Sequence, residues 1–292
     1  MPNALALMGG KLTQSQIDQY WDSGYLFPVQ VLDPETASNF RATLENIEAD
    51  WLDADLPKPL NTYKRVGAHV TMPFMVEISK SPAILDAVEG ILGPDIMIYS
   101  AELFIKEPKT SHVVTMHQDL TYWGLGAIDG LVTAWVALSP ATAESGCMDF
   151  VRGSHKNPIL PHEDTHDANN LLSRGQEIKV EVAEEDKTSI VLEPGQMSLH
   201  HGLTIHGSGP NTSDDRRIGV VIRYIRPDME QQVGARDFAM MARGEDRFGH
   251  FEHVPEPAAI FAPESLKLYD EIRAEQAKVL MKDSKKSAEM YS

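Results

Sequence analysis

The spacing of apolar residues changes from helical to strand-like near Ile96, and this change limits the fold more than any other feature of the 292-residue chain. Before it, Asp33-Pro34 supplies a capping carboxylate and a proline at the first helical position, and apolar residues recur at helical spacing over 40–51. Ser81-Pro82 repeats this arrangement, and Gly93-Pro94 comes after it as a terminating glycine and a helix breaker. The sequence therefore predicts leading helices, each with one buried face.

From Ile96 onward, short apolar runs of period two are separated by turn residues. Many short strands of this kind are typical of a sandwich or a barrel. The predicted fold is therefore mainly β with flanking helices. The expected strands are Ile96 to Lys106, Val113 to Leu120, Leu131 to Leu138, Cys147 to Val151, Ser189 to Leu192, Met197 to His200 and Ile218 to Ile225.

The chain shows no internal repeat, low-complexity tract or linker, which favours one domain over residues 1–292. The C-terminal part is predicted to end in a helix from Pro263 to Met290. Residues 158–172 are rich in His, Asp and Asn, and we interpret them as a surface loop or lid. The expected parts are a helical N-terminal part over about 1–95, a β core over about 96–226 and a C-terminal extension over about 227–292.

Composition excludes several kinds of partner. The chain has 43 acidic and 26 basic residues and a formal net charge of -17, which would repel a nucleic acid. No apolar stretch reaches the length of a membrane span, and no leader is expected at the N-terminus, so a reducing cytoplasm is the predicted location. Cys147 is the only cysteine, which leaves histidines and carboxylates to hold any metal.

The segment His117-Gln118-Asp119 carries the first two candidate metal ligands. In a strand, residues two apart point to the same side, so His117 and Asp119 can reach one ion. Two histidines and one carboxylate on one face leave three open positions on Fe(II), as a bidentate 2-oxo acid and dioxygen require. A lone His-x-Asp is a weak signal, and the pattern needs a second, distant histidine.

Several of the 11 histidines compete for these roles. His162-Glu163-Asp164 repeats the His-x-Asp spacing, but it lies in a polar loop without alternation. His250-Phe251-Glu252 lies in a charged stretch after the predicted strands end. His200 and His201 are stronger rivals, because they lie close to the expected second ligand and either could support the metal site or contact a substrate.

His206 is the preferred second histidine because of the segment that comes after it. This turn-rich segment leads into the apolar strand that begins at Ile218, and we interpret it as a hairpin centred on Asn211 and Thr212. In that hairpin, His206 and Arg217 are cross-strand neighbours. Arg217 could then bind a carboxylate in two-pronged fashion near the metal. The alternative for Arg217 is an exposed strand-end arginine that pairs with a nearby aspartate, Asp214 or Asp215.

Taken together, four motifs resemble the phytanoyl-CoA dioxygenase family of double-stranded β-helix oxygenases. The resemblance implies a jelly-roll, cupin-like core that uses Fe(II), 2-oxoglutarate and O2 and releases succinate and CO2. The motifs, in the family's order, are His117-Gln118-Asp119, Thr133-Ala134-Trp135-Val136-Ala137-Leu138, Glu144-Ser145-Gly146-Cys147-Met148 leading to Gly153-Ser154-His155-Lys156, and His206 followed by Pro210-Asn211 and Arg217.

The resemblance also implies roles for other residues. Chlorinating relatives carry a small residue in place of Asp119, so its presence here favours hydroxylation. Similarity makes Lys106 a candidate contact of the co-substrate or substrate, beside its ordinary interpretation as a strand-end lysine. The candidate substrate-pocket residues are Tyr122, Trp123, Trp135 and His201.

The substrate is less constrained than the reaction. Residues 61–76 contain no recognisable motif, and the chain ends in Met290-Tyr291-Ser292 rather than a peroxisomal tripeptide, so a phytanoyl-CoA substrate is not assumed. We expect a small polar or zwitterionic metabolite. Two alternatives remain: a metal-dependent hydrolase or isomerase on the same barrel, or a non-catalytic small-molecule binding module. The sequence leaves the oligomeric state open.

Overall fold

The structure is a computed structural model, and it describes residues 10–121, 123–126, 129–164, 169–172, 176–178 and 182–280. The α-helices in these ranges are α1 (Gln14–Ser23), α2 (Pro34–Trp51), α3 (Leu60–Arg65), α4 (Pro73–Ser79), α5 (Pro82–Leu92) and α6 (Pro263–Leu280). None of these helices combines the length and the apolar character needed to cross a membrane.

The strands form two larger sheets and one two-stranded sheet. They are β1 (Tyr25–Gln30), β2 (Ile96–Lys106), β3 (Val114–His117), β4 (Leu131–Ala137), β5 (Met148–Val151), β6 (His162–Asp164), β7 (Gln176–Ile178), β8 (Lys187–Ile190), β9 (Gln196–His201), β10 (His206–Ser208), β11 (Arg217–Ile225), β12 (Phe238–Arg243) and β13 (Glu252–His253).

The major sheet has the order β1-β9-β4-β11-β2-β12-β13, and the minor sheet has the order β3-β10-β5-β8. Strands β2, β4, β9 and β11 of the major sheet face the four antiparallel strands of the minor sheet, and this arrangement is a jelly roll. The predicted mainly β fold with flanking helices is therefore confirmed. Strands β6 and β7 form a separate two-stranded sheet.

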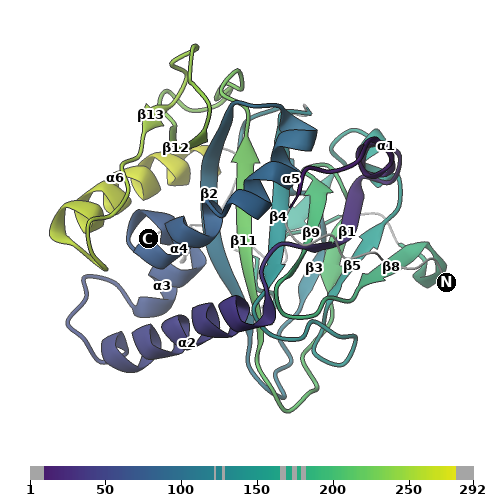
Figure 1. Cartoon of the computed structure of the whole chain (residues 1–292), viewed down its shortest axis with the longest axis horizontal. Coiled ribbons are helices and arrows are strands. Elements are labelled where there is room, and N and C mark those ends of the chain that lie inside the picture. Colours follow the sequence, from purple (N-terminus) through teal and green to yellow (C-terminus); the bar gives the residue numbers. More distant parts are fainter. Residues whose placement is uncertain are drawn as a thin grey trace.

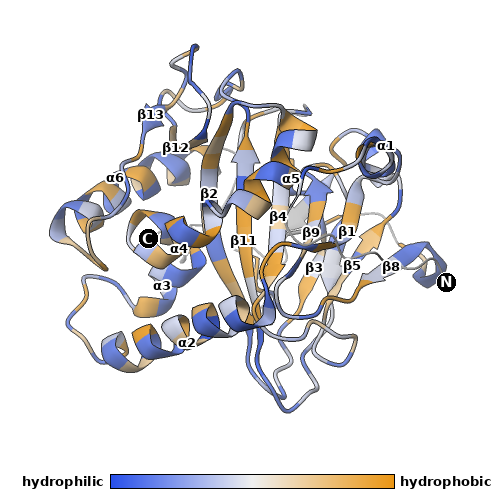
Figure 2. Cartoon of the chain, in the orientation of Figure 1, coloured by the Kyte–Doolittle hydropathy of each residue, from blue (hydrophilic) through white to orange (hydrophobic). Residues whose placement is uncertain are grey.

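Helices cover the outer face of the major sheet (Figure 1). Leu44 of α2 and Ile84 of α5 belong to the same buried cluster as Val220 and Ile222 of β11. Burial of an aliphatic side chain of this size contributes roughly 1.5–3 kcal/mol. Figure 2 shows that the hydrophobic residues gather along the central strands and on the helices that cover them. The expected start of α2 is also confirmed, because the Asp33 carboxylate accepts a hydrogen bond from the first turn.

A second buried cluster fills the space between the two sheets. It joins Trp135 and Val221 of the major sheet to Phe150 and Ile190 of the minor sheet. The candidate metal centre opens beside this cluster, so its walls come from both sheets. Packing between the sheets therefore sets the shape of the site.

The major sheet extends beyond residues 96–226. Strand β1 precedes the predicted β core, and β12 and β13 come after it. Local sequence does not reveal β1, because Pro28 interrupts its apolar run. The structure accommodates Pro28 where the register between β1 and β9 shifts and where β1 forms the edge of the sheet. The division of the chain into one domain with three parts stays a prediction.

Candidate metal centre

His117, Asp119 and His206 meet in a cavity between the two sheets. All three are buried, and their potential ligand atoms lie within 4.8 Å of one another. His117 ends β3, and it is the register partner of His206 at the start of β10. In the parts of the chain that the structure describes, these three form the only group of metal-binding residue types at such spacing.

Asp119 reaches this group by a turn rather than from a strand. The prediction of a strand from Val113 to Leu120 is wrong beyond His117, because a 3-10 turn spans Asp119–Thr121. The turn brings Asp119 Oδ1 within 3.5 Å of His117 Nε2 and 4.0 Å of His206 Nε2. The two side chains therefore converge, although strand alternation is not the reason.

Each imidazole is held through its Nδ1 atom. His117 Nδ1 lies 2.9 Å from the Thr115 carbonyl oxygen, and His206 Nδ1 lies 2.9 Å from the Thr204 carbonyl oxygen. A carbonyl oxygen can only accept a hydrogen bond, so both Nδ1 atoms donate and carry the proton. The Nε2 lone pairs of both rings are then available on the side of Asp119. This is how a metal-binding histidine is usually oriented by its surroundings.

The carboxylate of Asp119 is held in its ionised form. Burial would raise the pKa of Asp119, but the Arg223 guanidinium and the nearby imidazoles hold it well below its usual range. Thr133 Oγ1 donates a hydrogen bond of 2.9 Å to Asp119 Oδ2. Burial, His117 and His200 lower the pKa of His206 well below its usual range. An ionised carboxylate beside neutral imidazoles is the protonation state that binds a metal cation.

His200, and not His201, lies beside this group. His200 lines the cavity, and its Nε2 lies 3.5 Å from Asp119 Oδ2. His201 points away, since its Nε2 lies 3.0 Å from Asp129 Oδ1 and its ring packs against Trp21. The expectation that His201 lines the pocket is therefore corrected. Neighbouring residues on a strand face opposite sides, so only one of the pair can reach the cavity.

Arg217 and Lys106 lie directly opposite each other in the ladder between β11 and β2. Both are buried, and neither forms an ion pair with a described residue. Lys106 Nζ donates a hydrogen bond of 2.7 Å to Ser208 Oγ, and Arg217 Nη1 donates one of 2.8 Å to the Gly146 carbonyl oxygen. Like charges in directly opposed strand positions are destabilising, so a bound anion would favour the form in which both side chains are charged.

Burial changes the titration of both cations. Desolvation, followed by repulsion from Arg217, lowers the pKa of Lys106 to about 6. Desolvation also lowers the pKa of Arg217 to about 10. The Arg217 guanidinium lies beside the Trp135 ring, with 5.3 Å between its central carbon and the ring centroid, and its Nε atom has no hydrogen-bond partner. Arg217 lines the cavity of the metal centre, whereas Lys106 lies behind its lining and donates to Ser208 Oγ and to the carbonyl oxygens of Ser208 and Gly209.

The predicted hairpin between His206 and Arg217 is wrong. Strand β10 pairs with β3 and β5 in the minor sheet, whereas β11 pairs with β2 and β4 in the major sheet. The connecting segment therefore crosses from one sheet to the other. The two residues still line one cavity, because they reach it from facing sheets rather than from neighbouring strands.

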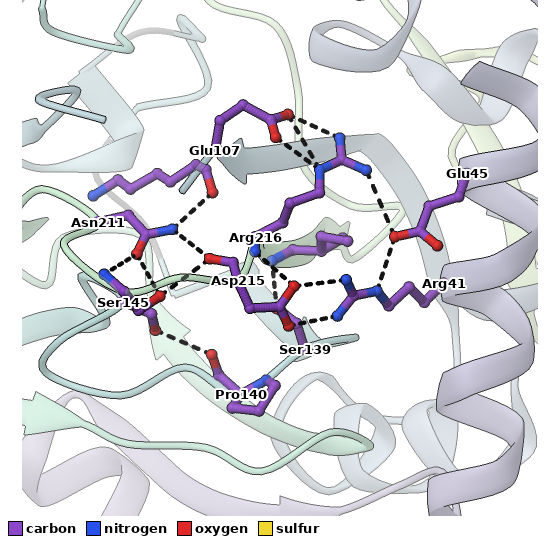
Figure 3. A network of polar contacts seen from close by, with 12 residues as sticks. Arg41, Glu45, Glu107, Ser139, Pro140, Ser145, Asn211, Asp215 and Arg216 are labelled. Atoms are coloured by element: carbon purple, nitrogen blue, oxygen red, sulfur yellow. Dashed lines mark hydrogen bonds and ion pairs between the residues drawn. The ribbon is translucent and has the colours of Figure 1, made fainter. Parts of the chain in front are cut away.

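The connecting segment is fixed by the polar network in Figure 3. Arg216 pairs with Glu48 at 2.8 Å and with Glu107 at 2.9 Å on the outside of the sheet. Asp215 pairs with Arg41 at 2.7 Å. Asp214 pairs with Lys109 at 2.9 Å, and Arg217 itself is buried, so Arg217 does not pair with Asp214 or Asp215 at the surface. Two successive arginines thus face opposite sides of the strand.

The aromatic candidates divide between two places. Trp135 lines the cavity of the metal centre, as expected. Trp123 lines a neighbouring cavity and stacks on Arg223, with 4.5 Å between the guanidinium carbon and the ring centroid. Tyr122 lies outside the described residues. The rival His162 accepts a hydrogen bond of 3.3 Å from the Gln118 backbone instead of joining the metal group.

Three polar residues of the cavity, Thr133, Ser208 and Arg223, were not predicted from the sequence as site residues. Thr133 and Arg223 interrupt otherwise apolar strands, and a polar residue in such a place is an available signal of an inward-facing site. Ser208 comes after His206 at the two-residue spacing of a strand, so it lies on the same side. In the predicted loop or lid over residues 158–172, His162–Asp164 forms strand β6, so the loop prediction is wrong there, and residues 165–168 lie outside the described ranges.

Comparisons with known proteins agree with this architecture. The non-heme monooxygenase ThoJ in its apo form superposes with a TM-score of 0.79 and is 30% identical, covering 91% of this chain and 98% of its own. A probable phytanoyl-CoA dioxygenase of Caenorhabditis elegans is 28% identical over 167 residues, which is 55% of this chain and 54% of that protein.

A probable alpha-ketoglutarate-dependent hypophosphite dioxygenase of Stutzerimonas stutzeri is 25% identical over 171 residues, which is 58% of this chain and 59% of that protein. The chain thus spans about half of the length of the curated relatives it matches. A family model described as phytanoyl-CoA dioxygenase (PhyH) matches residues 20–219, which is more than half of the chain. The chain therefore belongs to the phytanoyl-CoA dioxygenase (PhyH) family.

Proposed function

We propose that this protein is an Fe(II)- and 2-oxoglutarate-dependent dioxygenase that hydroxylates a C–H bond of a small metabolite. One observation carries the proposal. The buried group of His117, Asp119 and His206 shares its cavity with Arg217, a buried guanidinium without an ion-pair partner among the described residues, and Arg217 lies opposite a second buried basic residue, Lys106. A metal site beside two buried basic residues suits a co-substrate that is both a chelator and a dianion.

The residues present fit an iron ion. Two imidazoles whose Nδ1 atoms donate to carbonyl oxygens direct their Nε2 atoms toward Asp119, which offers an ionised carboxylate oxygen. This donor set leaves open positions in an octahedral shell, which is typical of non-heme Fe(II) oxygenases. We assign His117, Asp119 and His206 as the metal ligands. The relative from Stutzerimonas stutzeri, whose name specifies alpha-ketoglutarate dependence, supports the same cofactor chemistry.

We assign the binding of the co-substrate to the part of the cavity that the major sheet lines. A planar guanidinium binds a carboxylate in bidentate fashion, so Arg217 would hold the carboxylate of 2-oxoglutarate that lies far from the metal. The hydroxyl of Ser208 lines the same cavity and accepts a hydrogen bond of 2.7 Å from Lys106, so its own proton would be available to the co-substrate, while Lys106 would act through its charge. Trp135 packs beside Arg217 and limits how the guanidinium can turn. Together these residues would fix the direction in which the co-substrate enters.

Bound Fe(II), 2-oxoglutarate and dioxygen together supply the oxidative chemistry, with succinate and CO2 as co-products. The chain itself orients these groups and excludes water, and Asp119 stays ionised through Thr133 and Arg223. A metal-dependent hydrolase or isomerase would have no use for the buried cations at positions 106 and 217. A binding module without activity would have no need to keep both the ligand group and these cations.

The test is made on protein purified without oxygen. Addition of Fe(II) and 2-oxoglutarate should produce the visible metal-to-ligand absorption band of the chelate. We expect His206→Ala to abolish the band and Arg217→Ala to require at least about a hundredfold more 2-oxoglutarate, since loss of a buried ionic partner costs about 3 kcal/mol.

Arg216→Ala is the matched control, because it removes the neighbouring guanidinium from the opposite side of the strand. It should leave the affinity for 2-oxoglutarate within about threefold of wild type, as rim charges contribute little. A folded, iron-loaded wild type without the band would exclude the proposed chemistry. An equal loss of affinity in both arginine variants would remove Arg217 from the co-substrate site.

A further inference from the structure

A second cavity lies next to the metal centre. Its walls come from β2, from the loop that contains Trp123, from the segment before β12 and from α6. These elements lie together at one edge of the molecule, where α6 and β12 border β2 (Figure 1). None of the proposed metal or co-substrate residues lines this cavity.

The side chain of Arg223 forms the wall between the two cavities. On one side it lines the metal cavity, and its Nη2 atom lies 3.8 Å from Asp119 Oδ1. On the other side its Nη1 atom pairs with Glu102 Oε2 at 2.8 Å, and its guanidinium stacks on Trp123. Glu102 and Trp123 both line the second cavity. Among the described residues, Arg223 therefore lies between the second cavity and the proposed metal ligands.

The second cavity lies at the end of the site opposite to Arg217. Arg217 and Arg223 both line the metal cavity from β11, and they are six positions apart. Six residues of a strand span about 20 Å. Arg217 is proposed to bind the co-substrate, and Arg223 lies beside Asp119. The metal centre thus lies between the co-substrate end and the second cavity, which leaves the second cavity for the molecule that is oxidised.

Asp237 gives the second cavity its charge. The residue is 4% exposed, and its carboxylate accepts hydrogen bonds from the Phe238 backbone N–H at 2.9 Å, Tyr99 Oη at 3.0 Å and Gln231 Nε2 at 2.7 Å. No cationic side chain in the described ranges forms an ion pair with it. Burial, only partly offset by these hydrogen bonds, raises the pKa of Asp237 to about 6. A buried carboxylate with neutral partners is stabilised by any cation that enters beside it.

The other charges of this cavity already have partners. Glu102 pairs with Arg223, Glu275 pairs with Lys278, and Arg236 pairs with Glu252 and Glu271 on the surface. Asp237 is therefore the carboxylate of the cavity whose charge is not balanced by an ion pair. This observation separates the cavity from an ordinary acidic surface, where water and salt screen each charge.

Aromatic rings complete the second cavity. Tyr99 and Trp123 line it and meet edge to face, with ring centroids 6.1 Å apart. Gln231 fixes the arrangement, because its Nε2 atom donates to the Trp123 carbonyl oxygen at 2.9 Å as well as to Asp237. Ring faces attract organic cations, most strongly where water is excluded. A buried carboxylate and two aromatic rings are a suitable lining for an ammonium or guanidinium group.

We propose that the second cavity binds the cationic group of the molecule to be oxidised, a small organic cation such as an amine or a quaternary ammonium compound, with Asp237 as its counter-ion. Trp123 and Tyr99 form the aromatic walls. The identification of this cation as the substrate rests on the proposed function. The binding of a cation itself does not depend on iron or 2-oxoglutarate.

Binding is measured on metal-free protein with choline and with 3,3-dimethylbutan-1-ol, its uncharged carbon isostere, by titration calorimetry. Choline should bind at least about tenfold more tightly, the preference expected for a desolvated cation–π contact. Asp237→Asn keeps the shape and the hydrogen-bond acceptor, and it should reduce the preference to less than about twofold. Trp123→Leu should weaken choline more than the isostere. Asp22→Asn, a change at an exposed carboxylate far from β12 in the fold, is the matched control.

The outcomes separate this proposal from the oxygenase proposal. Equal binding of choline and its isostere to wild type, or an unchanged preference in Asp237→Asn, would overturn the cation site. The absorption band with Fe(II) and 2-oxoglutarate should persist in Asp237→Asn, which shows that the variant is folded and that its metal centre is intact. Cation binding without that band in wild type would overturn the oxygenase and leave the cation site in place.

Discussion

His117 and His206 are register partners across the ladder between β3 and β10, and each ring donates its Nδ1–H to a carbonyl oxygen two residues earlier in the chain. Their ring centroids lie 4.2 Å apart. The backbone therefore determines the tautomer of both rings before any ion arrives. A metal ion would find two oriented lone pairs and would have to organise little of the protein.

This geometry predicts that a divalent ion stabilises the fold. At a free concentration of 100 times its Kd, an ion stabilises the protein by about 2.7 kcal/mol, which raises the Tm of a chain of this size by roughly 5–10 °C. Thermal unfolding with Fe(II) under argon, or with Ni(II), measures the shift. His117→Ala and His206→Ala should lose it, and His201→Ala should keep it because His201 faces away. A full shift in His206→Ala would contradict the assigned ligands.

Lys106 predicts that 2-oxoglutarate binds together with a proton. Because burial lowers the pKa of Lys106 to about 6, its amine is mostly neutral at pH 7.5 in the free protein. A dianion beside it favours the ammonium form and raises that pKa. Binding should then take up close to about one proton at pH 7.5 and progressively fewer below pH 6, where Lys106 is already protonated.

Calorimetry in buffers of different ionisation enthalpy measures this uptake of protons. Lys106→Met keeps the length of the side chain and removes the titrating amine, so its uptake should fall to near zero. The same uptake in Lys106→Met and wild type would assign the proton to another group. Arg216→Ala, which changes a guanidinium on the outer face, should leave the uptake unchanged.

Gly219 predicts a steric effect on the site. A Cβ atom at this position would lie 2.0 Å from the Trp135 ring, so Gly219→Ala must displace the indole that packs beside Arg217. We expect a loss of roughly 1–3 kcal/mol in the free energy of unfolding, which is typical of overpacking. Urea denaturation measures it. Gly209→Ala is the control, because a Cβ there meets nothing within 4 Å and should cost almost nothing.

The hydrogen bonds of Asn211 predict that the connection between β10 and β11 stabilises both the fold and the site. Its Nδ2 atom donates to the carbonyl oxygens of Lys106 at 3.0 Å and Asp215 at 2.8 Å, and its Oδ1 atom accepts from the Ser213 backbone at 3.0 Å (Figure 3). Asn211→Ala should lower the free energy of unfolding by about 2–4 kcal/mol, because it leaves buried polar groups without partners.

The same change should also weaken the binding of 2-oxoglutarate, since it releases the end of β2 that carries Lys106. Chemical denaturation and titration with 2-oxoglutarate measure the two effects. Ser213→Ala removes one hydroxyl at the edge of the network and should cost less than about 1 kcal/mol. A neutral effect of Asn211→Ala on both measurements would show that the segment is held by its ion pairs alone.

The sequence was most informative where strand alternation is regular. The limits of β2, predicted as Ile96 to Lys106, agree with the structure because its apolar run is long and ends in turn residues. Alternation could also have separated His200 from His201. Met197 and Leu199 belong to the cluster beneath the helices, so Ser198 and His200 must face the other side of β9.

The hairpin prediction shows the limit of local spacing. A turn-rich segment between two short apolar runs fits a hairpin and a crossover between sheets equally well, and the choice depends on pairing with distant strands. Strand β10 prefers β3 and β5, which lie far away in the sequence. The placement of Arg217 near His206 was therefore correct, but the reason given for it was not. Trp123 was likewise placed near the site, and only the fold assigns it to the second cavity.

The minor sheet holds His206, and the major sheet holds Arg217, so neither sheet alone contains the proposed catalytic apparatus. Ligand binding then reports on the distance between the sheets. A partly denatured state that keeps its strands but loosens the packing of Trp135 against Phe150 would retain secondary structure and lose its affinity for 2-oxoglutarate. As denaturant is added, activity should therefore be lost before the circular dichroism signal, because activity depends on the packing between the two sheets.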